Sequence, residues 1–120
     1  MSKFKTTTYG NEKTILKFPD HYVNLAVTVS DVGVAANADG KKIVPAGTIL
    51  GGGFLSDDTI EAVPSSETVP AEGILFYDVD VTNGPESGAA LIHGFVDLAK
   101  LPKAPAAEEL AALKQITFLK

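Results

Sequence analysis

The sequence predicts a mostly β, β-rich α+β fold: a small single domain of short strands and hairpins, with one short C-terminal helix and a flexible N-terminal arm. Two apolar runs, at residues 22–29 and 73–81, have the period-two alternation of half-buried strands. Turn residues separate the strand-like runs, and residues 106–114 are rich in the helix formers Ala, Glu and Leu. The 120 residues fit one domain and contain no internal repeat.

Residues 1–13 are predicted to be the arm, and residues 14–120 the β-rich domain. The arm is polar, rich in Lys and Thr, and has no core-forming period, which is typical of a mobile terminus. Its stretch Phe-Lys-Thr-Thr-Thr-Tyr nevertheless has high strand propensity. Such an arm is suited to adding a strand to a partner's sheet; an ordinary mobile terminus is the alternative. The lysines at 3, 5, 13 and 17 indicate either a solvated tail or a docking arm for an acidic surface.

In the first half of the domain, residues 14–18 are predicted to form a short strand that Pro19-Asp20 ends. Residues 22–29 are predicted to form a longer strand, with one face made by Val23, Leu25, Val27 and Val29. Residues 37–40, Asn-Ala-Asp-Gly, are predicted to form a turn before a strand-like run at 41–44, because Asp-Gly tolerates positive φ. A further strand follows at 45–50.

In the second half, residues 56–72 are predicted to be an acidic loop, and residues 73–81 a strand. Residues 83–88 are predicted to be a loop that leads to the hairpin partner of that strand at 89–98. The helix is predicted at 106–114, with acids early and Lys114 late to match the helix dipole. Residues 115–119 are predicted to form a last short strand.

The composition excludes several classes of function. The chain has no Cys, which excludes disulfides, thiolate metal sites and cysteine nucleophiles. It also has no Arg and a net charge of −5, which argues against a nucleic-acid ligand. No apolar run approaches the roughly 20 residues of a membrane span, and the first residues lack the apolar core of a signal peptide. We therefore expect neither nucleic acid nor membrane as a partner.

Candidate motifs for ligand binding are weak. The triple glycine at 51–53 is not followed by the Lys and helix of a phosphate-binding loop, so a bulge or a close backbone approach is predicted instead. The run from Asp78 to Gly84 resembles a calcium loop only in part, because the expected Gly and Glu positions hold Asn83 and Ala89. Solvent-facing acids on a half-exposed strand are the preferred interpretation of Asp78 and Asp80.

Candidate catalytic groups are equally weak. His21 and His93 are far apart in the sequence, so they form no His-x-x-x-His metal pair, and His93 is predicted to be a packed or edge residue. The acids Asp57, Asp58, Glu61 and Glu67 lie in the predicted loop with no aromatic platform for a sugar, so a solvated acidic loop is favoured over paired catalytic carboxylates. The chain is therefore expected not to be an enzyme and to need no cofactor or metal.

The order of features between Lys41 and Pro102 resembles a known family. It runs Lys-Ile-Val-Pro-Ala-Gly-Thr-Ile-Leu, then a polar excursion, then Gly-Ile-Leu-Phe-Tyr-Asp-Val-Asp-Val-Thr, a Gly-rich loop, and Ala-Leu-Ile-His-Gly-Phe-Val-Asp-Leu-Ala-Lys-Leu-Pro. This pattern is similar to the lambda-type head decoration proteins of tailed bacteriophages. The resemblance covers roughly the C-terminal two thirds, and the first forty residues match by their polar character.

The resemblance implies a non-enzymatic structural virion protein. Such proteins bind the outer surface of the expanded capsid as homotrimers, at three-fold and quasi-three-fold sites, and cement neighbouring major capsid protein subunits. Their N-terminal arms order on the shell by pairing with a capsid strand. In this chain the resemblance would give that capsid-binding role to Lys3, Phe4, Lys5, Thr6, Thr7, Thr8 and Tyr9.

Two other classes of function remain as alternatives. One is a small β-rich binding module for a cell-surface glycan, against which stand the absent Trp and the three scattered tyrosines. The other is a small hydrolase or isomerase that uses a His and a carboxylate. A pocket joining His21 or His93 to an acid and a nucleophile would favour that enzyme.

Overall fold

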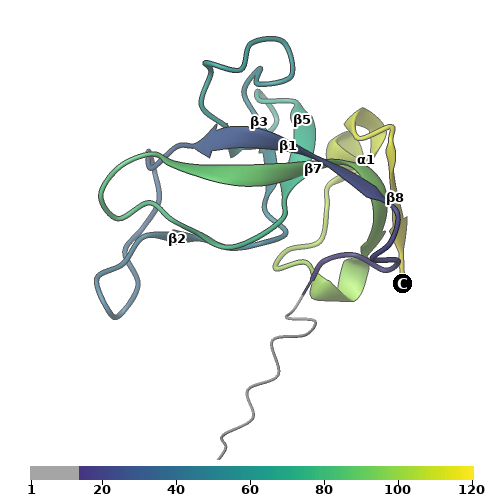
Figure 1. Cartoon of the computed structure of the whole chain (residues 1–120), viewed down its shortest axis with the longest axis horizontal. Coiled ribbons are helices and arrows are strands. Elements are labelled where there is room, and N and C mark those ends of the chain that lie inside the picture. The colour runs from purple at the N-terminus through teal and green to yellow at the C-terminus, as the bar shows by residue number, and fades with distance from the viewer. Residues whose placement is uncertain (1–13) are drawn as a thin grey trace, which may run out of the picture.

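A computed structural model describes residues 14–120 of the chain (Figure 1). The fold is mostly β, as predicted, with one short C-terminal helix. The elements are β1 (Tyr22–Val29), β2 (Ile43–Val44), β3 (Ile49–Gly51), β4 (Val63–Pro64), β5 (Ala71–Leu75), β6 (Val79–Asp80), β7 (Glu86–Asp97), a 3-10 turn (Leu98–Lys100), α1 (Ala107–Ala112) and β8 (Ile116–Leu119).

The main sheet is organised around β7. Its strand order is β1-β7-β5-β3-β4, all antiparallel, and β8 pairs with β7 in parallel. On one edge, β7 pairs with β1 along most of its length. On the other edge it pairs first with β5 and then, from Gly94 onward, with β8. The long β1–β7 pair crosses the molecule in Figure 1, with α1 and β8 at one end and β2 at the other.

Each face of the main sheet carries its own hydrophobic cluster, because neighbouring residues of a strand point to opposite faces. Ile74 and Leu91 are paired across β5 and β7 and belong to the first cluster, which is completed by Leu113, directly after α1, and by Ile116 of β8. The neighbouring pair Leu75 and Ala90 belongs to the second cluster. The small β2–β6 sheet covers that second cluster with Val44 and Val79.

The prediction of a regular strand at 14–18 is wrong, because this segment forms only an isolated bridge. Leu16 forms a single antiparallel bridge with Val96, and the Lys17 N–H donates to the Phe95 carbonyl oxygen at 2.8 Å. This segment therefore continues the edge of β7 on which β1 lies. Residues 18–21 separate it from β1 and form no ladder, because Pro19 lacks the N–H that a strand needs.

The predictions for 22–29 and for the turn at 37–40 are confirmed. β1 spans Tyr22–Val29, with Val27 and Val29 buried and Leu25 half-buried. Val23 departs from the predicted buried face and is 49% exposed. In the turn, Gly40 has a φ of 77° and its N–H donates to the Asn37 carbonyl oxygen at 3.0 Å.

The predicted strand at 73–81 is two strands in two sheets. β5 ends at Leu75 and pairs with β3 and β7, whereas β6 begins at Val79 and pairs with β2. The chain turns between them because Asp78 Oδ1 accepts a hydrogen bond from the Ala46 N–H at 2.7 Å, which ties the corner to the loop before β3. The predicted hairpin with 89–98 therefore holds only for β5.

Two predicted loops contain strand residues. Within 56–72, Val63–Pro64 forms β4, and Ala71 already belongs to β5. Glu86 to Gly88 lie inside β7, because they pair with Val29, Thr28 and Val27 of β1. Pairing with β1 thus extends β7 by three residues beyond the predicted start.

The predicted helix and the last strand are confirmed with shorter bounds for the helix. α1 spans Ala107–Ala112, and Glu109 Oε1 accepts a hydrogen bond from the Ala106 N–H at 2.8 Å at its start. Lys114 lies beyond the last helical turn, so the predicted late lysine is not part of the helix. Leu113 is buried in the first cluster, whereas Leu110 is 44% exposed.

Candidate functional site

The residues predicted to bind a capsid all lie outside the described residues, so that prediction stays a prediction. They are Lys3, Phe4, Lys5, Thr6, Thr7, Thr8 and Tyr9. Within residues 14–120, the structure instead brings together two groups of side chains that are separated in the sequence. One contains both histidines, and the other contains Tyr22 and Tyr77.

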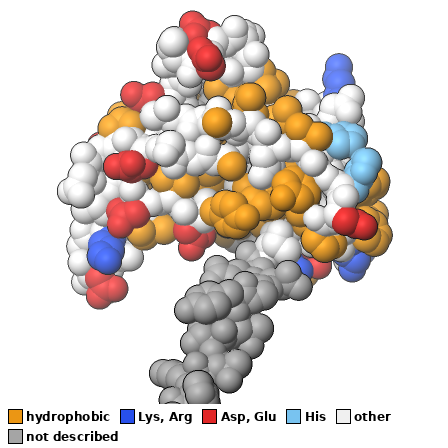
Figure 2. All heavy atoms as spheres, viewed as in Figure 1, with side chains coloured by type: hydrophobic (Ala, Val, Ile, Leu, Met, Phe, Trp, Pro, Cys, Tyr) orange, Lys and Arg blue, Asp and Glu red, His pale blue; other side chains and the backbone are white. Residues whose placement is uncertain are grey.

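His21 and His93 are in direct contact. Their Nε2 atoms are 3.0 Å apart, and the centroids of their rings are 5.0 Å apart. The pale-blue histidine side chains lie together at the right-hand edge in Figure 2. Although 72 residues separate the two histidines in the sequence, the pairing of β1 with β7 brings them together. Their distance in the sequence therefore did not predict their distance in the fold.

A β-bulge in β7 places His93 beside His21. Val23 pairs with His93 and Asn24 pairs with Leu91, so Ile92 has no partner in β1. In a regular strand, residues two apart point to the same face, and His93 would then share the buried face of Leu91. The extra residue reverses this alternation and turns His93 to the outer face of the sheet, where His21 also lies.

Neighbours on the same face support the histidine pair. His93 Nδ1 is 3.1 Å from Gln115 Oε1, an oxygen that only accepts hydrogen bonds. This contact favours the tautomer of His93 that has its proton on Nδ1, which leaves the Nε2 lone pair facing His21. The rings of His21 and Phe95 are 5.7 Å apart, and Phe18 packs edge-on against Phe95 at 5.5 Å.

The second group, here called the tyrosine group, consists of Tyr22, Phe76 and Tyr77. Tyr22 stacks on Phe76 with ring centroids 5.0 Å apart, and Tyr77 meets Phe76 edge-on at 4.7 Å. Phe76 is buried, whereas Tyr22 is 43% and Tyr77 is 60% exposed. Two of the three tyrosines that look scattered in the sequence thus share one buried phenylalanine.

A surface groove borders the tyrosine group. It has a volume of about 940 Å³ and is lined by Tyr77, Asp78, Lys100 and Thr14, among others. Hydrophobic side chains form a band across the lower part of the face seen in Figure 2. An aromatic ring with a carboxylate and an ammonium group beside it is a surface that takes polar ligands with an apolar face.

The glycine run at 51–53 is a close backbone approach, as predicted. A Cβ built on Gly51 would lie 2.1 Å from the Pro70 carbonyl oxygen. Beyond it, the N–H groups of Gly53 and Phe54 both donate to Glu72 Oε1, at 2.6 and 3.0 Å. A carboxylate of the chain itself thus occupies the donors that a phosphate-binding loop would present.

Two of the acids considered for catalysis or calcium binding, Asp57 and Asp80, make local hydrogen bonds instead. Asp80 Oδ1 accepts bonds from the N–H and the hydroxyl of Thr82, which lower the pKa of Asp80. Asp57 Oδ1 accepts the N–H of Thr59 at 2.9 Å and its hydroxyl at 2.6 Å, and these bonds lower the pKa of Asp57. Among residues 14–120, no group of three or more His, Cys, Asp or Glu side chains is placed to share a metal ion.

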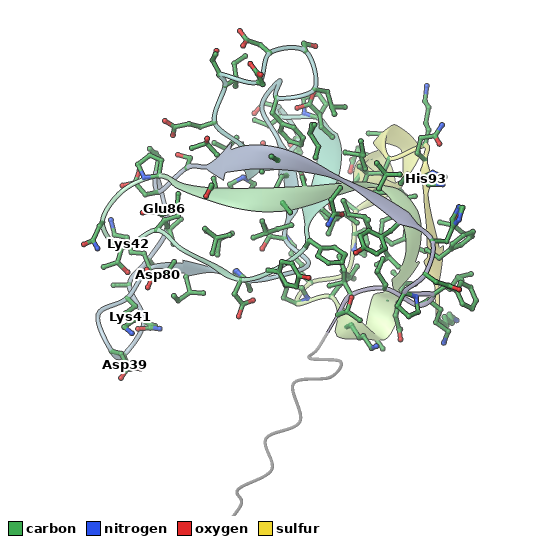
Figure 3. The ribbon with its side chains drawn as sticks, in the orientation of Figure 1. Asp39, Lys41, Lys42, Asp80, Glu86 and His93 are labelled. Atoms are coloured by element: carbon green, nitrogen blue, oxygen red, sulfur yellow. The ribbon has the colours of Figure 1, made fainter. Side chains whose placement is uncertain are left out.

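Charged side chains gather at the end of the molecule opposite His93 (Figure 3). They come from the 37–40 turn, the two residues before β2, β6 and the start of β7: Asp39, Lys41, Lys42, Asp80 and Glu86. The attraction of Lys41 contributes to the low pKa of Asp80, after the larger effects of the Thr82 hydrogen bonds. This end mixes both signs of charge, which is typical of a solvated surface.

Comparison with known proteins gives no further assignment. The chain matches no protein-family model, and no curated protein is significantly similar to it. No helix in the described part of the chain has the length and apolar character needed to cross a membrane.

Proposed function

We propose that this protein is a bacteriophage head decoration protein that binds the expanded capsid as a homotrimer and cements neighbouring major capsid subunits. In this proposal it works on the outer surface of the virion, without catalysis and without a cofactor. The support comes from the sequence resemblance and from where the resembling segments lie in the fold.

The main support for the proposal is that the segments that resemble the decoration proteins lie next to one another in the fold. The Pro-Ala-Gly-Thr-Ile-Leu run leads into β3, the Gly-Ile-Leu run forms most of β5, and the Ala-Leu-Ile-His-Gly-Phe-Val-Asp run lies in β7. These strands are neighbours in the order β7-β5-β3. The resembling residues therefore make the continuous centre of one sheet.

The two ends of the resembling region also pack together. A Cβ built on Gly47 would lie 2.6 Å from Pro102 Cδ and 3.1 Å from Leu101 Cδ2. The Leu-Pro end thus lies directly on the glycine of the Pro-Ala-Gly-Thr segment. Short motifs that meet in space restrain each other, so their joint presence is stronger support for a shared fold than either motif alone.

The energetics of the proposed role follow from multivalency. A single arm that orders on a capsid strand loses a few kcal/mol to that ordering, so one chain binds weakly. A trimer carries three arms, and linked binding events raise the overall affinity without any new contact. Binding then depends on sites spaced as on the expanded lattice.

Co-sedimentation tests the proposal. Shells of the encoding phage that lack this protein are prepared in unexpanded and expanded forms and mixed with the full chain. We expect saturable binding to expanded shells alone, at about three copies per three-fold site, as the resemblance implies. Absence of binding to either shell would overturn the proposed function.

A deletion of residues 2–13 tests the arm separately. We expect weaker capsid binding and an unchanged circular dichroism spectrum, because the strands of the domain lie after residue 13. A variant with the same twelve residues in scrambled order is the matched control for length and charge. Capsid binding that is equal in all three proteins would contradict a role of the arm.

A glycan-binding module is the second candidate, and the tyrosine group favours it. Tyr77 is exposed and lines the groove together with Asp78 and Lys100. Its ring offers an aromatic surface on which a sugar could stack, which the scattered tyrosines of the sequence did not indicate. Tyr77→Ala would abolish glycan binding on an array and leave capsid binding intact. Glycan binding without capsid binding would favour this candidate over decoration.

A further inference from the structure

The two histidines have the spacing of a pair of metal ligands. Imidazole nitrogen binds late first-row divalent metals at about 2.0–2.1 Å. Two nitrogens 3.0 Å apart, each at that distance from one ion, subtend an angle of about 90° at the ion. This is the angle between neighbouring ligands in octahedral and square-planar complexes. We propose that His21 and His93 form a two-ligand binding site for a late transition metal ion: Cu²⁺, Ni²⁺ or Zn²⁺.

The hydrogen bond to Gln115 prepares His93 for this role. Because the Gln115 Oε1 atom accepts the Nδ1 proton, Nε2 keeps its lone pair and directs it toward His21. A second partner that fixes the tautomer of a metal-bound imidazole is the usual support of such ligands. The backbone positions are also fixed, because His93 lies in β7 and His21 directly precedes β1, whose pairing with β7 begins at Tyr22 and Gly94.

His21 supplies the adjustment that metal binding needs. In the metal-free protein the Nε2–H of His21 donates to Nε2 of His93. Coordination requires this proton to move to His21 Nδ1, by exchange with water, and both Nε2 lone pairs to point at one spot beside that line. The His21 side chain is exposed and precedes the strand, so rotation about its side-chain bonds meets little resistance. His93 stays in place through Gln115 and the strand.

The donor set decides which ions fit. Two neutral imidazoles suit Zn²⁺, Ni²⁺ and Cu²⁺, whereas Mg²⁺ and Ca²⁺ prefer oxygen donors. No cluster of acidic groups joins the pair among residues 14–120. The remaining coordination positions are left to water or to a donor from a neighbouring molecule, so the site binds ions exchangeably. The whole sequence holds two histidines and no cysteine, so no other imidazole or thiolate of the chain competes.

Calorimetric titration of the full chain with NiCl₂, CuCl₂ and ZnCl₂ at neutral pH tests this site. We expect one ion per chain, with Cu²⁺ bound more tightly than Ni²⁺ or Zn²⁺, and no binding of MgCl₂ or CaCl₂. His21→Gln and His93→Gln are each expected to lower the affinity at least tenfold. The double variant measures the background from all other groups.

Gln115 distinguishes a paired site from a lone histidine. Gln115→Ala is expected to weaken binding about tenfold or more, because His93 then loses the partner that fixes its tautomer. Thr117→Ala, at the exposed position of the adjoining strand β8, is the matched control and should leave the affinity unchanged. An affinity equal to wild type in either single histidine variant would overturn the proposal.

Nuclear magnetic resonance gives a readout that does not depend on affinity. Paramagnetic Cu²⁺ should broaden the imidazole signals of both histidines and the amides around residues 21–23, 92–95 and 115. The charged end around Asp80 should stay sharp. Broadening at one histidine alone, or first at the charged end, would contradict a shared site. His21→Gln changes an exposed side chain, so this test survives if the His93 variant fails to fold.

Discussion

Gly51 and Pro70 approach each other so closely that no side chain fits between them. A Cβ on Gly51 would be 2.1 Å from the Pro70 carbonyl oxygen and 3.1 Å from the Pro70 carbonyl carbon. The approach arises where the register of β3 and β5 shifts: Leu50 pairs with Gly73 and Gly51 with Ala71, so Glu72 is the extra residue.

Gly51→Ala is therefore expected to destabilise the protein, by about 1–3 kcal/mol as for other overpacked positions. The contact is with backbone, which cannot rotate away, so the strands must separate. Urea denaturation followed by circular dichroism measures the change. Gly84→Ala is the control, because Gly84 has a φ of 122° and open space around it, so that variant reports conformational strain alone. A Gly51→Ala protein as stable as wild type would refute the close approach.

Glu72→Ala is expected to cost about 1–3 kcal/mol of stability, because it leaves the partly buried N–H groups of Gly53 and Phe54 without their acceptor. Glu72→Gln keeps one acceptor oxygen and should cost less. The free energy of unfolding in urea ranks the two variants. Glu67→Ala, at an exposed side chain in the same part of the chain, should change stability little. The reverse ranking would argue against the carboxylate as the acceptor.

Ile74→Ala is expected to cost about 2–5 kcal/mol, because the side chain is fully buried and pairs with Leu91 at the centre of the sheet. Val32→Ala removes a side chain that is 76% exposed, and should change stability by less than about 0.5 kcal/mol. Thermal denaturation of both variants compares them directly. Similar melting temperatures would mean that the Ile74 site is not core.

Acid should lower the stability of the protein in part by protonating Asp80 of β6. Hydrogen bonds from Thr82 hold the pKa of Asp80 below its usual value, so this carboxylate stabilises the fold above its unfolded pKa and stops doing so as pH falls through its folded pKa. The stability difference between wild type and Asp80→Asn should thus be constant near neutral pH and shrink below about pH 4. Urea midpoints measured across this range give the profile.

Thr82 provides the control for that profile. Thr82→Ala removes the hydroxyl donor, so the pKa of Asp80 rises and the acid dependence becomes weaker. Thr82→Ser keeps the hydroxyl and should retain the wild-type profile. An identical profile in the alanine variant would mean that the hydroxyl does not hold the carboxylate charged.

The regular elements of the fold could be predicted because local patterns decide them. Alternation gave β1, Asp-Gly gave the turn at Gly40, and composition gave α1. The division of 73–81 into two strands could not be predicted, because a hydrogen bond from Ala46, distant in sequence, holds Asp78 at the corner. Local alternation is the same for one long strand and for two strands in different sheets.

The histidine pair depends on information that no local pattern carries. Ile92 is an ordinary apolar strand residue, and only the register with β1 makes it the extra residue of a bulge. If the alternation of a regular strand continued from the buried Leu91, His93 would point into the core. The exposed tyrosines are a similar case, because Tyr22 and Tyr77 meet through Phe76 only after the sheet has formed.

The central place of β7 has a consequence for biosynthesis. Its partner β1 comes far earlier in the chain, and its partner β8 comes after it, so the edge of β7 that pairs with β5 and β8 is incomplete until Leu119 has left the ribosome. Long-range pairing of this kind folds slowly and late. The nascent chain therefore holds β1 open as an unpaired strand for most of its synthesis, and a message truncated before Ile116 yields a product prone to aggregate through the bare edge at Gly94 to Asp97.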